Sequence, residues 1–397
     1  MAQPHEDSLK HVPELDGIRG LAILGVLCSH GAGLAGLFDN LNSWPNTIIR
    51  YTMVPLWGGV DLFFALSGFL ITGILLRTKN STNYFSAFYA RRALRIFPIY
   101  FLVLTLTLIA GHFSAILEDQ LPHWTSWKVA YFMYLPNWPI FWHGQKGMEG
   151  LWGSYWSLAV EEQFYFVWPF LVFLLRQEVV AWICYLGIAC ALPLRIVLSH
   201  LYFGNNIGLA QITSSRVDGL FLGAASAIYL FRHKRPIPMP WILGFAAGGG
   251  GIMGYIIAFH REELVNTGKG TSLCTWGITG FALLSGALVG ISQHKIWWIQ
   301  RILSLKWLRA AGKYSYGMYV YHLFIFIPIR YLGNRTGLWL RLNFIERFFS
   351  FVLEAMLVFL VAKLSYDLLE SRFLRLKSYF EPRKNVTVAV AALQSEP

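Results

Sequence analysis

About ten stretches of this chain each contain roughly 20 mainly apolar residues, the length that an α-helix needs to cross the hydrocarbon core of a bilayer. They lie near residues 17–37, 55–76, 96–117, 157–175, 179–199, 216–231, 240–259, 271–292, 314–332 and 347–368. Hydrophobic residues occupy 55% of the 397 positions and charged residues only 14%, which leaves too few polar side chains to cover a water-soluble fold. Backbone groups in hydrocarbon must form their hydrogen bonds internally. The sequence therefore predicts an all-α, polytopic transmembrane helical bundle.

One further apolar segment, near residues 129–142, differs from these ten. It is short, and Pro136 and Pro139 interrupt it. Proline removes a backbone donor and breaks the interior of a helix. We expect a re-entrant or interfacial segment here, because irregular backbone at membrane depth is tolerated against protein or water.

The basic residues are distributed unevenly between the loops. With the N-terminus in the cytoplasm and ten spans, the cytoplasmic loops contain most of the Lys and Arg residues, as the positive-inside rule requires. An eleventh span at 129–142 would place the densest basic clusters outside. We therefore expect both termini in the cytoplasm. Topology and contact with anionic membrane lipid explain the formal net charge of +12, and no nucleic acid partner is expected.

The chain shows no sequence signal for a soluble domain or a cleavable signal peptide. We expect a single integral membrane domain over 1–397, with its core at about 13–375 and a short cytoplasmic tail after about 376. The four cysteines lie inside apolar runs without metal-ligand spacing, so they are interpreted as packing residues and no metal site is expected.

The first apolar run contains two ionisable residues, whose side chains are unfavourable in the hydrocarbon core of a membrane. Arg19 and His30 are eleven residues apart, which on an α-helix is about 16 Å of rise and close to three turns. They should lie on one face, with Arg19 toward the cytoplasm and His30 toward the outer side. Ionisable groups at membrane depth are candidate functional residues. The alternative is that Arg19 snorkels to lipid headgroups and His30 bonds a buried carbonyl.

Three arginines lie just before the core of the third run, at Arg91, Arg92 and Arg95. Guanidinium groups match the geometry of phosphate oxygens, so these residues are candidates for a phosphate clamp. Simple anchoring of the helix end at the membrane surface is the alternative.

Two adjacent carboxylates, Glu161 and Glu162, open the run near residue 157. Neighbouring positions on a helix point about 100° apart, so the two side chains cannot face one pocket equally. A carboxylate here can act as a general base or orient a histidine. The alternative is a favourable interaction with the helix dipole.

Two later stretches also carry polar groups into apolar runs. Arg216 and Asp218 open one run, where a structural Arg–Asp pair is the simplest interpretation. Tyr316, Tyr319 and His322 fall at i, i+3 and i+6, on a loosely shared helix face. A buried histidine among tyrosines is commonly a packing residue, and a supporting role in catalysis is the alternative.

Taken together, these stretches resemble the acyltransferase-3 family of integral membrane acyltransferases. The opening LDGIRGLA carries the R-x10-H spacing of the family in Arg19 and His30. The further blocks, in order, are FFALSGFLITGIL at 63–75, ARRALRIFPIY at 90–100, WSLAVEEQFY at 156–165, SRVDGLFLG at 215–223 and YSYGMYVYH at 314–322. The resemblance covers about residues 13–375, and the ordered set of motifs is far more specific than any one of them.

The resemblance implies an enzyme of the bacterial inner membrane that moves an acyl group, often acetyl, from cytoplasmic acyl-CoA to a hydroxyl of a glycan or glycolipid. Acyl-CoA would be a co-substrate, and no permanently bound cofactor is expected. Some members acylate macrolides or other small molecules, which is an alternative here. Others carry a fused extracytoplasmic SGNH-hydrolase-type domain. This chain ends before such a domain, so we expect it to act alone or with a separate partner protein.

The resemblance also implies roles for individual residues. His30 would be the general base on the acceptor hydroxyl, or alternatively a transient acyl carrier, and Glu161 would orient it and stabilise its cation. The three arginines of the third run, together with Arg19, would hold the nucleotide end of the donor. The expected supporting residues are Glu162, Gln163, Arg216, Asp218, Tyr319 and His322.

Three other classes of protein remain open. A transporter of an envelope glycan precursor would predict inverted repeats, which the sequence does not display. A receptor-like membrane protein without chemistry would make Arg19 and His30 structural. The other class of membrane-bound O-acyltransferases also uses a buried histidine, but the R-x10-H opening argues against it.

Overall fold

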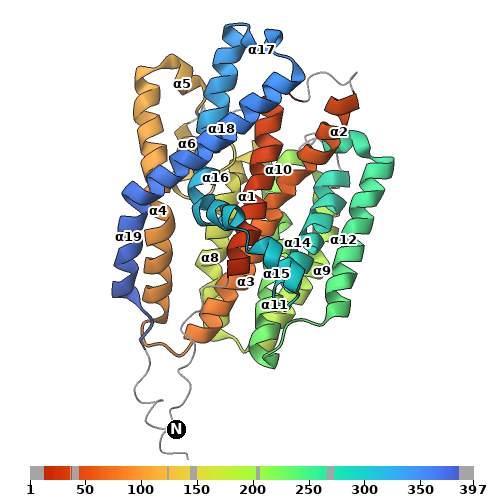
Figure 1. The fold of residues 1–397 in the computed structure, drawn as a ribbon. Helices are drawn as coiled ribbons and strands as arrows, with labels where there is room; N and C mark the ends of the chain where they lie inside the picture. The colour runs from red at the N-terminus through yellow and green to blue at the C-terminus, as the bar shows by residue number, and fades with distance from the viewer. Residues whose placement is uncertain are drawn as a thin grey trace, which may run out of the picture.

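A computed structural model describes residues 13–35, 37, 44–122, 125–143, 150–202, 206–265 and 272–383 of the chain. Within these ranges all regular structure is helical and no strand occurs (Figure 1). The predicted all-α fold is therefore confirmed.

Each of the ten predicted spans coincides with a long helix. These helices are α1 (Pro13–Leu34), α3 (Gly59–Thr78), α4 (Tyr84–Phe113), α8 (Trp156–Leu174), α9 (Gln177–Leu201), α11 (Val217–His233), α12 (Met239–Phe259), α14 (Ile278–Ser292), α16 (Lys306–Arg335) and α18 (Phe344–Ser365). Eight helical segments of the described part are long and apolar enough to cross a membrane. The two long helices not among them are α11, with 17 residues, and α16, which contains five Lys or Arg residues.

Shorter helical elements connect the long ones. They are α2 (Trp44–Met53), η1 (Val54–Gly58), α5 (Ala115–Asp119), α6 (Thr125–Phe132), α7 (Asn137–His143), α10 (Asn206–Gln211), η2 (Thr213–Ser215), α13 (Arg261–Val265), η3 (Leu273–Gly277), α15 (Trp297–Leu303) and α17 (Leu338–Arg341). The segment predicted to be re-entrant or interfacial is split into α6 and α7, of eight and seven residues. Tyr134, in the break, has a φ of +55°. Neither helix is long enough to span a bilayer, as predicted.

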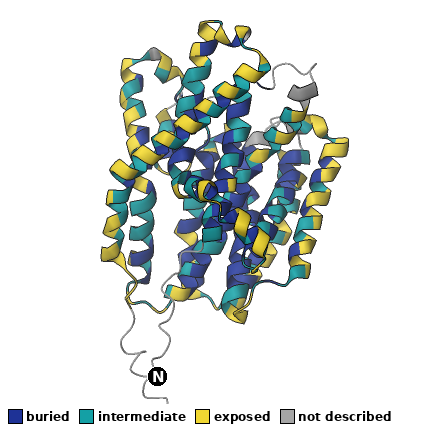
Figure 2. Ribbon diagram, in the orientation of Figure 1, coloured by how far each residue is buried: buried dark blue, intermediate teal, exposed yellow. Residues whose placement is uncertain are grey.

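The long helices form an inner and an outer group. Buried residues are concentrated on the central helices, whereas the peripheral helices present exposed side chains (Figure 2). In the inner group α1 packs against α3 and α16, and α3 packs against α11 and α14. In the outer group α12 covers α14, α18 covers α16 and α9 covers α11. The candidate residues of α1 and α16 are thereby placed in the interior of the bundle, and α8 packs against α3.

Glycines allow the inner helices to approach one another closely. A Cβ on Gly312 of α16 would lie 1.9 Å from the carbonyl oxygen of Asp16 of α1, and a Cβ on Gly20 would lie 2.1 Å from that of Leu308. The same reciprocal contact joins α3 and α11, where a Cβ on Gly68 would meet the oxygen of Leu220 at 1.9 Å. Small residues at such positions let helix backbones pack directly in membranes.

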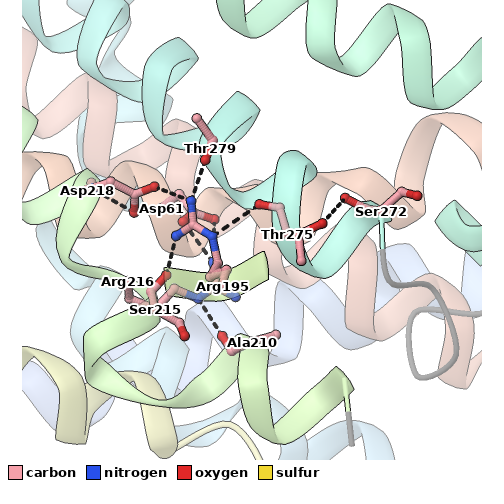
Figure 3. Close-up of polar contacts among 10 residues, drawn as sticks. Asp61, Arg195, Ala210, Ser215, Arg216, Asp218, Ser272, Thr275 and Thr279 are labelled. Carbon is pink, nitrogen blue, oxygen red and sulfur yellow. Dashed lines mark hydrogen bonds and ion pairs between the residues drawn. The ribbon is translucent and has the colours of Figure 1, made fainter. Parts of the chain in front are cut away.

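Two buried ion pairs tie α3, α9 and α11 together (Figure 3). Arg195 of α9 donates to Asp218 of α11 at 2.7 Å, and Arg216 donates to both carboxylate oxygens of Asp61 of α3, at 2.8 and 3.0 Å. Arg195 also donates to the Thr279 hydroxyl. The simple pair between Arg216 and Asp218 is therefore not what forms. Each residue has a partner on another helix.

The chain after α18 continues as η4 (Tyr366–Glu370), α19 (Ser371–Arg375) and η5 (Leu376–Phe380), which lie against α4 (Figure 1). Asn83 donates through Nδ2 to the Glu381 carbonyl and accepts at Oδ1 from the backbone N–H of Arg383. Contacts with the bundle thus continue to residue 383, beyond the position near 376 where the tail was expected to begin.

Candidate functional site

The first feature of the site is a pair of histidines from α1 and α16. The Nδ1 atom of His30 lies 2.9 Å from Nε2 of His322, and the rings stack with centroids 5.1 Å apart and planes inclined by 8°. His322 is fully buried and His30 is half-buried. The Nδ1 atom of His322 lies 2.6 Å from the carbonyl oxygen of Tyr319. The sequence identified both histidines as candidates but contained no signal that they are partners.

Arg19 lies on the same helix as His30, nearer the N-terminal end of α1. Its Nη1 donates to Asp16 at 2.7 Å. Arg19 lines a cavity together with Tyr316 of α16, and His30 contacts His322 of the same helix. Both side chains therefore lie on the side of α1 that packs against α16, as the eleven-residue spacing predicted.

Glu161 does not contact His30, contrary to the expectation that it orients this histidine. Its Oε1 accepts from the hydroxyl of Ser67 at 2.7 Å, and its Oε2 accepts from the hydroxyl of Tyr165 at 3.0 Å. The nearest cation is Arg92, with Nη2 3.9 Å from Oε2. The physical reason is that α8 directs this carboxylate toward α3 and α4, whereas His30 faces α16.

Glu162 lies on a different side of α8, as adjacent positions require. Its Oε1 is 4.0 Å from Nε of Arg92. Both atoms are buried and make no hydrogen bond to any residue that the structure describes. The Arg92 guanidinium also lies 3.8 Å from the centroid of the Tyr165 ring. Arg92 is thus held among two carboxylates and an aromatic ring.

Two neighbouring cavities lie beside these groups. The inner cavity, of about 170 Å³, has polar residues on its wall beside apolar ones from α3. Its polar lining residues are Arg19, Ser67, Arg92, Arg95, Ser157, Glu161, Tyr165, Ser315, Tyr316 and Tyr319. The outer cavity, of about 530 Å³, shares Arg19, Arg95 and Tyr316 with the inner one. The two cavities therefore meet at these three residues.

The outer cavity is strongly basic. Its lining includes five cationic side chains, Arg19, Arg95, Lys306, Arg309 and Lys313, against two acidic ones, Asp16 and Glu370. Of the three arginines predicted to bind the donor, Arg95 lines both cavities, Arg92 lines the inner one and Arg91 lines neither. Because the ninth span was predicted to begin near residue 314, Lys306, Arg309 and Lys313 fell in the loop before it. Their i, i+3, i+7 spacing is the signal that would have indicated one basic helix face.

Tyr319 links the inner cavity to the histidine pair. Its hydroxyl lies 2.5 Å from the Ser157 hydroxyl and donates to the carbonyl of Ser154 at 2.8 Å. Its ring centroid is 5.5 Å from that of His322. His30 and His322 are not among the described residues that line either cavity, so Tyr319 is the lining residue that contacts the pair.

Three other predicted residues lie away from the histidines and support the bundle. Gln163 donates to the carbonyl of Tyr134 at 2.8 Å and to Oδ1 of Asn137 at 2.9 Å, so it fixes the break between α6 and α7. Arg216 and Asp218 belong to the two ion pairs of Figure 3. In the described part of the chain no group of three or more His, Cys, Asp or Glu residues is arranged to hold a metal ion.

Comparison with known proteins gives a consistent picture. A protein-family profile described as an acyltransferase domain matches residues 12–363. Among similar proteins are the peptidoglycan O-acetyltransferase OatA of Listeria monocytogenes (27% identity, 92% of this chain and 56% of the relative) and the putative peptidoglycan O-acetyltransferase YrhL of Bacillus subtilis (26%, 91% and 54%). The O-acetyltransferase OatA of Staphylococcus aureus is 27% identical over 92% of this chain and 57% of its own length. The chain spans a little over half the length of these relatives. No solved structure matches it.

Proposed function

The chain belongs to this acyltransferase family, and on that premise we propose that it transfers an acyl group, specifically acetyl, from acyl-CoA to a hydroxyl of a cell-envelope glycan. The names of the relatives support peptidoglycan as the acceptor. The observation that carries the proposal is the basic outer cavity, which shares Arg19, Arg95 and Tyr316 with a smaller cavity whose lining residue Tyr319 contacts His322.

The outer cavity suits the nucleotide end of the donor. Acyl-CoA carries several phosphates, and the five cations outnumber the two acidic groups around this space. Arg19 and Arg95 present guanidinium forks, and Lys306 and Lys313 add point charges. Arg91 and Arg92 are not proposed to contact the phosphates. Arg91 lines neither cavity, and Arg92 faces Glu161 and Glu162.

The inner cavity suits the thin pantetheine arm and the thioester. Val60, Phe63 and Leu66 of α3 contribute part of its apolar wall. Its polar lining includes Ser157 and Tyr319, which contact each other, and Tyr319 also contacts His322. Glu161 and Arg92 place charge along the wall and are proposed to position the arm.

His30 is proposed as the general base. It removes the proton from the acceptor hydroxyl while the hydroxyl oxygen attacks the thioester carbonyl and the carbon–sulfur bond breaks. The proton then passes to the departing CoA thiolate, so the products are an acyl ester and free CoA. Positioning of both substrates and proton transfer supply the rate acceleration.

The proposed orientation in the bacterial inner membrane has both termini in the cytoplasm. The basic outer cavity lies at the N-terminal ends of α1 and α16, where Arg19, Lys306 and Lys313 meet. Positive residues favour the cytoplasmic side, which is also where acyl-CoA is found. His30, eleven residues further along α1, is then nearer the extracytoplasmic side of the membrane, where the glycan acceptor is available.

The test is acyl transfer by the chain in bilayer discs supplied with isotope-labelled acetyl-CoA and peptidoglycan fragments, followed by mass spectrometry of the fragments. We expect labelled ester in the wild type and none with His30→Ala. His200→Ala, at the exposed end of α9, is the matched control and retains activity. Undiminished transfer by His30→Ala would overturn the proposed role of this residue, and absence of labelled glycan with the wild type would overturn the proposed reaction.

A further inference from the structure

We propose that His322 is a positioning residue that fixes the tautomer of His30, so that Nδ1 of His30 carries the proton and Nε2 carries the lone pair. The distances between His30, His322 and the Tyr319 carbonyl determine the tautomer. The significance for catalysis rests on the proposed function, in which His30 is the general base.

A backbone carbonyl fixes the protonation of one nitrogen of His322. The oxygen of Tyr319 lies 2.6 Å from Nδ1 of His322. A carbonyl oxygen can accept a hydrogen bond but cannot donate one. Nδ1 of His322 must therefore carry a proton.

The other nitrogen of His322, Nε2, is a hydrogen-bond acceptor. In a neutral imidazole one nitrogen is a donor and the other an acceptor, so a proton on Nδ1 makes Nε2 the acceptor. An imidazolium at position 322 would be a fully buried charge beside Tyr319 and Phe326, with no carboxylate against it among the described residues. The neutral form is therefore the one that the site accommodates.

The acceptor on His322 determines which nitrogen of His30 carries the proton. Its Nδ1 lies 2.9 Å from Nε2 of His322, which is an acceptor, so Nδ1 of His30 must donate. The lone pair of neutral His30 is then on Nε2, which makes no hydrogen bond to any described residue. When Nε2 takes a proton, the bond from Nδ1 is preserved and the ring need not turn.

This arrangement resembles the Ser-His-Asp triad of hydrolases, in which the aspartate carboxylate accepts a hydrogen bond from the catalytic histidine and holds it in the correct tautomer. Here a neutral histidine, itself held by a backbone carbonyl, takes the place of the carboxylate. Glutamine at position 322 also offers both a donor group, the amide NH2, and an acceptor, the amide oxygen, whereas phenylalanine preserves the stacked ring but offers neither.

Nitrogen NMR of the full chain, labelled with ¹⁵N-histidine and reconstituted in bilayers, tests the tautomer without any measurement of activity. The signals of His30 are identified by their loss in His30→Asn. We expect a protonated Nδ1 and an unprotonated Nε2 in the wild type. A protonated Nε2 with an unprotonated Nδ1 would overturn the proposal, and this result requires no variant at position 322.

Acyl-transfer kinetics test the positioning role. We expect His322→Phe to lower kcat by on the order of 10²-fold with little change in the KM for acyl-CoA, because a part of the general-base contribution is lost. His322→Gln should recover most of kcat, and His200→Phe should match the wild type. Equal activities of the Phe and Gln variants would contradict the role of the hydrogen bonds.

The two proposals fail in different ways. If His30→Ala retains acyl transfer while the wild-type spectrum has the expected tautomer, the general-base role is wrong and the tautomer assignment stands. If His30 is essential but His322→Phe retains the wild-type kcat, the positioning role of His322 is wrong and the proposed function stands.

Discussion

The imidazole of His30 is hydrogen-bonded to the imidazole of His322, with 2.9 Å between the nitrogen atoms, although 292 positions separate the two residues in the chain. The contact depends on how closely α1 approaches α16. The packing of these two helices therefore determines which nitrogen of His30 is hydrogen-bonded.

Gly312→Ala should weaken this helix contact. The added Cβ would lie 1.9 Å from the carbonyl oxygen of Asp16, so the backbones must separate. Overpacking of this kind costs about 1–3 kcal/mol. We expect a lower Tm in detergent and a loss of acyl transfer. Gly250→Ala in α12 is the control, because nothing lies within 4 Å of its added Cβ. Equal Tm values for the two variants would contradict the packing argument.

Neutralising the basic face of α16 should weaken donor binding. In the double variant Lys306→Gln, Arg309→Gln, we expect the KM for acyl-CoA to rise by about tenfold, corresponding to ~1.4 kcal/mol of lost phosphate interaction, with kcat little changed. The wild-type KM should also rise with salt more steeply than that of the variant, because salt screens these charges. Arg235→Gln, on an exposed residue outside the cavities, is the control. A salt dependence identical in the wild type and the variant would argue against phosphate binding here.

Glu161 and Arg92 should be energetically coupled. Their charged atoms are 3.9 Å apart in a partly buried setting beside the inner cavity. Each single variant, Glu161→Gln or Arg92→Gln, leaves one charge less compensated, so the effect of both together should be smaller than the sum of the two. We expect a coupling of about 0.5–3 kcal/mol in a double-mutant cycle on kcat/KM. Strict additivity would show that the two residues act independently.

The ion pair between Arg195 and Asp218 should contribute strongly to stability. Both side chains are buried, so Asp218→Asn leaves an uncompensated guanidinium inside the bundle and should cost about 3–5 kcal/mol in the free energy of unfolding. The same substitution in an Arg195→Met background should cost much less. The exposed pair of Lys363 and Asp367 is the control, and Lys363→Gln should leave stability unchanged within error. Similar losses at both pairs would contradict the importance of burial.

Much of the fold follows from local sequence. Apolar runs of about 20 residues mark the helices, because each helix satisfies its own backbone hydrogen bonds whatever its neighbours are. Pro136 and Pro139 lack the backbone donor that a continuous helix needs, so they marked α6 and α7 as separate from the spans. The spacing of Arg19 and His30 also placed both on one helix face before any packing was known.

The partners of the site residues followed from packing alone. Glu161 was expected beside His30 and instead binds Ser67 and Tyr165, while His30 binds His322. Hydropathy identifies a helix but does not determine its rotation or its neighbours. Those depend on contacts between residues far apart in the chain, such as Gly20 and Gly312 with the opposing backbones.

The sequence by itself therefore determined that this protein is a bundle of membrane helices with ionisable residues at particular positions along them. The tertiary structure decided which of these residues meet and which of them line the basic cavity. The physical reason is that the hydrogen bonds of a helix are local, whereas the contacts that orient a side chain belong to the packing of the whole bundle.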